Sequence, residues 1–157
     1  MRITDIEAHT IWPPYNDFNA HTLKRYHGPL IQCRTVYVVH TDTGLQGISD
    51  SWGGGPDADT VRDKYLGTDP FDWVNAEVDL YMNMALYDLM GKHVGVPAWK
   101  LMGPKLRSWI PVAAWTVSQE PAAMAEEVRQ AAAKGYRWMK YHVDEVQNVI
   151  RQAEAMQ

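Results

Sequence analysis

The sequence predicts an α+β domain over residues 1–108, followed by the first two units of a β/α domain over residues 109–157. Short β-branched and alternating segments before Asp50 indicate an antiparallel sheet. A wide apolar face from Met82 to Met90 indicates a buried helix. After Trp109 the order strand, helix, strand, helix is typical of a parallel sheet.

Three strands are expected in the first part. Ile3 to Trp12 alternates imperfectly, and Ile31 to His40 contains a β-branched run. The hairpin-type turn after His40 contains Gly44, and the chain then returns as a third strand from Leu45 to Asp50. The segments Pro13 to Pro29 and Ser51 to Pro56 are expected to be loops.

Helices are expected from Ala58 to Leu66 and from Asp72 into the apolar run. Asp88 interrupts that run, and Lys92 lies four residues later, where the two side chains can pair. Gly91 and Gly95 are expected to break the helix before a second, short one. That short helix is expected to have Pro97 in its first turn and to end at Gly103-Pro104.

In the second part, strands are expected over Pro111 to Thr116 and Arg137 to Val143. The helix between them is expected from Pro121 to Lys134, with Gly135 after its end. Asp144 is interpreted as the N-cap of a last helix, with Gln147 three residues on.

Composition excludes several classes of function. A net charge of −4 gives no electrostatic basis for binding nucleic acid or an anionic membrane. The N-terminal residues alternate like a strand, so no signal peptide or transmembrane helix is expected. Cys33 is the single cysteine, which excludes an internal disulfide and fits the cytoplasm. We therefore expect a cytoplasmic protein.

The stretch from Asn83 to Gly103 resembles the signature Ala-x-Trp-Asp-x-x-Gly-Lys-x-x-Gly-x-Pro-x-x-x-Leu-Leu-Gly. This is the signature of the enolase superfamily, mandelate racemase/muconate lactonizing enzyme-like branch; Tyr87 and Met102 depart from it. The junction Arg107 to Ala113 and the later Gly135-Tyr136 are also similar to that family. The resemblance implies a capping domain over residues 1–108 and the start of a (β/α)-barrel over 109–157. Because a complete barrel needs about 250 residues, the barrel is expected to be truncated.

Lys140 and His142 are the candidate catalytic residues. Residues two apart in a strand share a face, and barrel strands present catalytic side chains from their carboxyl ends. A cation beside a base favours the neutral form of that base. The resemblance to Lys-x-Lys implies that His142 is the base that removes the proton α to a carboxylate, with Lys140 as the auxiliary residue. The departure to His leaves the stereochemistry and the identity of the base open.

The resemblance also implies a Mg²⁺ ion that stabilises the enediolate, held by carboxylates from later barrel strands that lie beyond Gln157. No metal ligand is assigned in this chain. The two capping-domain loops cover the active site in this family. In this chain the corresponding segments, matched by their order, are Pro13 to Pro29 and Ser51 to Gly55. They contain the candidate substrate-binding residues His21, Lys24, Arg25, His27 and Trp52.

Two classes of function are consistent with these patterns. The first is the N-terminal part of a Mg²⁺-dependent acid-sugar dehydratase, or of a racemase or epimerase of the same superfamily. Its partner would be a small carboxylate substrate, and the protein would be a homo-oligomer as family members commonly are. The second is a catalytically incompetent chain that acts as an interaction module, because two isolated barrel units leave strand edges and apolar faces uncovered. In either case the 157 residues alone are expected to be inactive.

Overall fold

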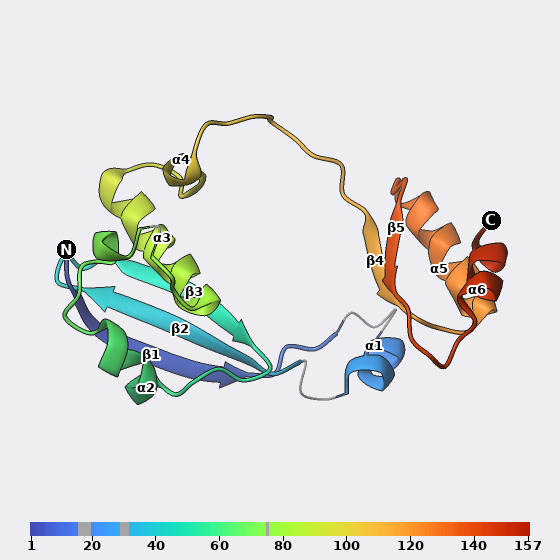
Figure 1. The fold of residues 1–157 in the computed structure, drawn as a ribbon, viewed down its shortest axis with the longest axis horizontal. Coiled ribbons are helices and arrows are strands. Elements are labelled where there is room, and N and C mark those ends of the chain that lie inside the picture. The colour runs from blue at the N-terminus through green and yellow to red at the C-terminus, as the bar shows by residue number, and fades with distance from the viewer. Residues whose placement is uncertain (16–19, 29–31, 75) are drawn as a thin grey trace. The chain divides into compact units, whose positions relative to one another are not determined.

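A computed structural model describes residues 1–15, 20–28, 32–74 and 76–157. The chain divides into two compact units (Figure 1). Unit 1 contains Met1–Pro13 and Pro29–Leu106, and unit 2 contains Pro14–Gly28 and Arg107–Gln157. A segment from the first thirty residues therefore belongs to the same unit as the C-terminal residues.

Unit 1 is built on a three-stranded antiparallel sheet, as the sequence predicts. Its strands are β1 (Ile3–Ile11), β2 (Arg34–Thr41) and β3 (Gln46–Trp52), in the order β1-β2-β3. Alternate residues of β2 are buried, so one face of the sheet is turned to the core. Ile31, the predicted start of the second strand, and residues 16–19 and 29 of the predicted first loop lie outside the described residues.

The third strand is longer than predicted. Trp52 pairs with Arg34 and Ser51 pairs with Thr35, so both belong to the ladder and not to the loop that their composition suggested. The loop that was expected to begin at Ser51 begins with Gly53, whose φ is 72°.

The helical segments α2 (Ala58–Tyr65), η2 (Pro70–Trp73), α3 (Leu80–Val94) and α4 (Trp99–Met102) accompany this sheet. The side chain of Asp57 caps α2 by accepting a hydrogen bond from the Thr60 amide at 2.8 Å. The helical stretch predicted from Asp72 into the apolar run is divided into two pieces. The short η2 helix ends at Val74, which is extended, and α3 begins only at Leu80.

The helix α3 lies across one face of the sheet (Figure 1) and supplies much of the core. Its buried side chains are those of the predicted apolar face: Met82, Ala85, Leu86, Leu89 and Met90. The predicted pair forms, with Lys92 Nζ 2.7 Å from Asp88 Oδ2. The same carboxylate accepts the Ile48 amide at 3.1 Å, and Lys92 donates to the Gln46 carbonyl at 2.7 Å. This pair therefore joins α3 to β3.

Gly91 does not break α3, contrary to the prediction; it is a buried residue inside the helix. A Cβ at this position would lie 2.8 Å from the Val96 carbonyl oxygen, so glycine is needed for the close approach of the following turn. Only Gly95, with φ 70°, ends the helix in the left-handed conformation.

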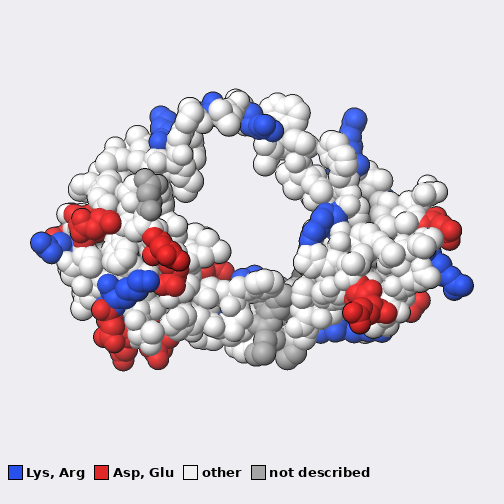
Figure 2. All heavy atoms as spheres, in the orientation of Figure 1, with Lys and Arg blue, Asp and Glu red and all other residues white. Residues whose placement is uncertain are grey.

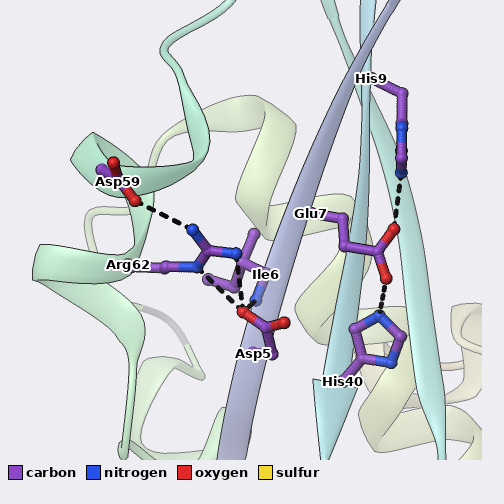
Figure 3. Close-up of polar contacts among 7 residues, drawn as sticks. All are labelled: Asp5, Ile6, Glu7, His9, His40, Asp59 and Arg62. Atoms are coloured by element: carbon purple, nitrogen blue, oxygen red, sulfur yellow. Dashed lines mark hydrogen bonds and ion pairs between the residues drawn. The ribbon is translucent and has the colours of Figure 1, made fainter.

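Charged side chains pair across the elements of unit 1. Arg62 on α2 is within 2.8 Å of Asp5 on β1 and 2.9 Å of Asp59, and Glu7 contacts His9 and His40, each at 2.7 Å (Figure 3). The hydrogen bonds to His9 and His40 lower the pKa of Glu7, and the one to His9 has the larger effect. On the visible face of this unit, basic and acidic side chains are interspersed (Figure 2).

Unit 2 contains α1 (Ala20–His27), β4 (Ala114–Val117), α5 (Pro121–Ala133), β5 (Met139–His142) and α6 (Val149–Met156). The strands β4 and β5 are parallel neighbours, as predicted, although both are shorter than their predicted ranges. The interpretation of residues 13–29 as a loop was wrong, because residues 20–27 form a helix that packs against β4. Packing can stabilise an eight-residue helix that local propensity alone would not.

Polar contacts join α5 to β4 and α6 to the residues that follow β4. Thr116 Oγ1 donates to Glu127 Oε2 at 2.9 Å, and Gln152 Nε2 donates to Ser118 Oγ at 2.9 Å. The last helix begins later than predicted. Asn148 caps it by accepting from the Ile150 and Arg151 amides, so Asp144 is not its N-cap.

Within the described ranges, no helix has both the length and the apolar character that crossing a membrane requires.

Candidate active site

Lys140 and His142 lie on the face of β5 that carries Trp115 of β4. Trp115 pairs with Lys140, and Val117 pairs with His142. Lys140 Nζ is 5.6 Å from the centre of the Trp115 ring, and the His142 ring meets the same indole edge-on at 5.7 Å. Both candidate catalytic side chains therefore contact one aromatic ring. The neighbouring Thr116 points the other way, toward α5.

The helix α1 covers this face. The His27 ring stacks on Trp115 at 6.0 Å with an interplanar angle of 10°, and the Tyr26 ring lies 6.4 Å from that of His142. Tyr26 also donates a hydrogen bond to the Val143 carbonyl at 3.2 Å. Tyr26, His27, Trp115, Lys140 and His142 thus form one cluster, which we call the histidine cluster.

Burial lowers the pKa of His27, and the nearby His142 lowers it further. The Nε2 atom of His27 is buried and has no hydrogen-bond partner among the residues that the structure describes. Both effects favour the neutral form of His27, next to the residue predicted to be the base.

Beside the histidine cluster lies a pocket of about 660 Å³. One side is formed by α1, including His21, Arg25 and Tyr26, and the other by the segments that follow β4 and β5. Asp144 is part of its lining. The hydrogen bonds that Asp144 accepts from the Gln147 and Val146 amides and from Ser118, together with Arg25, lower its pKa.

The structure separates the residues predicted to bind substrate. His27 joins Lys140 and His142, whereas His21 and Arg25 line the pocket. Lys24 is exposed on α1 and lines neither of these sites. Trp52 belongs to unit 1, where it is 61% exposed and lies under the Arg34 guanidinium at 5.6 Å.

Sequence reasoning missed three residues of this region: Tyr26, Trp115 and Asp144. The signal for Trp115 was its place in the predicted strand, since this residue pairs with Lys140 in the ladder. Tyr26 was hidden in a segment interpreted as a loop, and Asp144 was interpreted only as a helix cap.

Magnesium prefers several oxygen ligands. No group of three or more His, Cys, Asp or Glu side chains suited to a metal ion occurs within residues 1–15, 20–28, 32–74 and 76–157. These residues therefore do not fit a Mg²⁺ site by themselves.

No family model matches the sequence. Among curated proteins, D-galactonate dehydratase of Xanthomonas oryzae pv. oryzae (strain PXO99A) is 28% identical over 75 residues, which cover 48% of this chain and 20% of the relative. D-gluconate dehydratase of Thermoproteus tenax is 33% identical over 63 residues, covering 38% of this chain and 13% of the relative.

Solved structures match nearly the whole chain. A mandelate racemase/muconate lactonizing family protein from Azoarcus sp. EbN1 has a TM-score of 0.73 and 24% identity, over 99% of this chain and 45% of its own. Dipeptide epimerase from Enterococcus faecalis V583, complexed with Mg and L-Leu-L-Tyr, has a TM-score of 0.71 and 16% identity, over 99% of this chain and 50% of its own.

The chain has the mandelate racemase/muconate lactonizing enzyme fold. This confirms the predicted resemblance and fold class: a three-stranded antiparallel sheet with helices, followed by parallel strands with helices. The chain spans about half the length of the mandelate racemase-like structures that it matches, and its matched segment spans at most 20% of these curated relatives. The activity of a whole mandelate racemase-like protein is thus a proposal for this chain.

Proposed function

We propose that the chain is the N-terminal part of an enolase-superfamily acid-sugar dehydratase that begins its reaction by removing the proton α to a carboxylate. The observation that carries this proposal is the placement of His142 and Lys140 beside one aromatic ring at the carboxyl end of β5. The similarity to galactonate and gluconate dehydratases supports acid sugars as the substrate class.

In the proposed reaction, His142 accepts the α-proton through a ring nitrogen. His142 is exposed, so a substrate can reach its ring. The Lys140 ammonium lies near the same indole and would attract the substrate carboxylate. Capping-segment residues, among them His21 and Arg25, would hold the rest of the acid.

Magnesium belongs to the proposal as an expectation from the resemblance, supported by the Mg-containing epimerase neighbour. By the same resemblance, its carboxylate ligands are expected from later barrel strands. A cytoplasmic location and a homo-oligomeric assembly are likewise proposed.

The test is exchange of the substrate α-proton in D₂O with Mg²⁺, followed by proton NMR, using the protein that carries these residues with a complete barrel. We expect His142→Ala to reduce the exchange rate by about 10²–10⁴-fold, the usual contribution of a general base. His9→Ala is the control, because this exposed histidine lies in unit 1. Exchange at the wild-type rate in His142→Ala would remove His142 from the role of sole base.

Racemisation or epimerisation is the second candidate outcome, favoured by the dipeptide epimerase neighbour. It shares proton abstraction with dehydration and differs in the fate of the carbanion-like intermediate. Product analysis separates the two: a dehydratase forms a 2-keto-3-deoxy acid, whereas a racemase or epimerase returns deuterated substrate of inverted configuration.

A role as an interaction module is favoured by apolar exposure in unit 2. Side chains including Trp109, Ile110, Val112, Val146 and Ile150 are more than 60% exposed. The intact mass of the purified protein discriminates this role from catalysis. A mass of 17.9 kDa would mean that the protein consists of these residues alone and would favour the module. A much larger mass would favour the enzyme.

A further inference from the structure

The backbone ladder between β4 and β5 ends at the pair that contains the proposed base. Its last paired residues are Val117 and His142, and both strands end there. The end of a ladder opens more easily than its middle. The position of His142 relative to Trp115, which pairs two residues earlier in the ladder, is therefore the one that the backbone fixes least.

A side-chain contact joins the two strands again, directly beyond this last pair. Ser118 is the first residue after β4, and its hydroxyl donates to Asp144 Oδ1 at 3.1 Å. Asp144 follows His142 by two residues. The same Oδ1 accepts the Val146 amide at 3.1 Å and the Gln147 amide at 3.0 Å, so the carboxylate is held in one orientation. The contact with Ser118 thus extends the connection between the strands past the end of the ladder.

Gln152 on α6 supports this contact from the interior of unit 2. Its side chain is 0% exposed, and its Nε2 donates to Ser118 Oγ at 2.9 Å and to the Gln119 carbonyl at 2.6 Å. An amide NH₂ group only donates, so the Ser118 oxygen accepts this bond and the hydroxyl proton is left for Asp144. Gln152, Ser118 and Asp144 therefore form one directed chain of hydrogen bonds from α6 to the end of β5.

Packing alone does not account for a glutamine at position 152. Its Oε1 is buried and has no hydrogen-bond partner among the residues that the structure describes. A buried acceptor without a partner destabilises the folded state, and an apolar side chain of similar volume, such as methionine, would avoid that cost. The contribution of Gln152 that methionine could not supply is its pair of donors to the residues after β4.

We propose that Ser118, Asp144 and Gln152 are positioning residues, which hold the end of β5 against β4 so that His142 keeps its place beside Trp115. Asp144 acts in this chain as a hydrogen-bond acceptor, and its charge is not required. The proposal rests on the proposed function for the role of His142. None of the three residues is assigned a contact with the reacting atoms.

The first test measures the position of His142 without any activity. The rings of His142 and Trp115 have their centres 5.7 Å apart, so nuclear Overhauser cross-peaks between their ring protons report this contact in the 157-residue chain. Ser118→Ala removes the link between the strands, and Gln152→Met breaks the chain while preserving side-chain volume. We expect both variants to weaken these cross-peaks. Ser108→Ala is the control, because this serine of the same unit is exposed.

Two variants of Asp144 separate hydrogen bonding from charge. Asp144→Ala removes the acceptor and should weaken the cross-peaks, whereas Asp144→Asn keeps a carbonyl oxygen in the place of Oδ1 and should retain them. Equal loss in Asp144→Asn and Asp144→Ala would overturn the role of Asp144 as a neutral acceptor. Cross-peaks of wild-type strength in Ser118→Ala and Gln152→Met would overturn the proposal, because the backbone ladder would then suffice.

The second test is kinetic and uses the protein that carries these residues with a complete barrel. Misplacement of a catalytic group lowers the rate of the chemical step, so Ser118→Ala should reduce kcat for α-proton exchange by about 10–100-fold. The KM should change by less than about threefold. A change confined to KM would overturn the proposal. Weakened cross-peaks in Ser118→Ala, combined with no α-proton exchange by the wild type, would instead overturn the proposed function and leave the positioning role standing.

Discussion

His27 combines a buried ring nitrogen with a place in the proposed active site. Its ring stacks on Trp115, its Nε2 is buried without a partner among the described residues, and His142 lies near enough to lower its pKa. A neutral His27 is compatible with this packing. A protonated one would place an unpaired charge in a partly apolar contact, beside His142 and Lys140 on β5.

Packing of α1 should accordingly depend on pH. The pKa of His27 is lowered from 6.5 in the packed state, so the released helix binds protons more readily. The contribution of this packing to stability is complete above pH 6.5 and is lost as pH falls toward the lowered pKa. Hydrogen exchange of the α1 amides between about pH 5 and 7.5, corrected for intrinsic rates, measures this effect.

We expect α1 to lose protection in acid faster than α5 does in the wild type, and His27→Gln to remove most of that difference. His93→Gln, on α3 in unit 1, is the control and should behave like the wild type. Equal pH dependence in His27→Gln and the wild type would show that another group controls the packing; His142 is the histidine in contact with this cluster.

At the scale of elements, the closest approach is that of α3 to β3. A Cβ on Gly47 would meet the Ala85 carbonyl oxygen and would lie 2.7 Å from Leu89 Cγ. Because Gly47 has no side chain, the backbone of α3 can lie directly on β3. The hydrogen bonds of Asp88 and Lys92 to the backbone of β3 stabilise the same contact.

Gly47→Ala should therefore destabilise unit 1 by about 1–3 kcal/mol, the usual cost of overpacking, although alanine is otherwise the better strand residue. Urea unfolding followed by far-UV circular dichroism measures the change. Gln46→Ala, at the exposed neighbouring position, should cost much less. An unchanged midpoint in Gly47→Ala would mean that α3 can move away from β3 at little cost.

The elements that have a local sequence pattern could be predicted from the sequence. The sheet, α3 and its Asp88–Lys92 pair, and α5 are indicated by periodicity, spacing, and the Pro and Gly at the ends of α5. The prediction failed where tertiary contacts determine whether a segment is a helix, a strand or a loop. The polar α1 is a helix that packs on β4, and Ser51 and Trp52 join β3 because β2 is available to pair with them.

The same distinction applies to the candidate site. The two-residue spacing predicts that Lys140 and His142 share a face, and both contact Trp115. No sequence pattern could divide the five predicted substrate residues between the histidine cluster, the pocket and unit 1, because that division depends on how the chain folds back after Pro13.

For the whole molecule, the segment between α4 and β4 is the expected point of proteolysis. Lys105 and Arg107 are exposed and lie outside any helix or strand. Limited trypsin digestion at about pH 7.5 should cut there first, as mass spectrometry of the fragments would show. Lys64 is the comparison, because it lies in α2 and pairs with Asp79. Earlier cleavage after Lys64 would contradict the order expected from the structure.

That nick would not separate the protein into its two units. Unit 2 takes α1 from the N-terminal fragment and its remaining elements from the C-terminal one. The two polypeptides should then stay together through the contacts of Tyr26 and His27 with β4 and β5. Two chains that contain residues 1–106 and 107–157 should therefore assemble when they are mixed. Their assembly would report whether α1 is docked on β4 and β5, in the manner of a split-protein sensor.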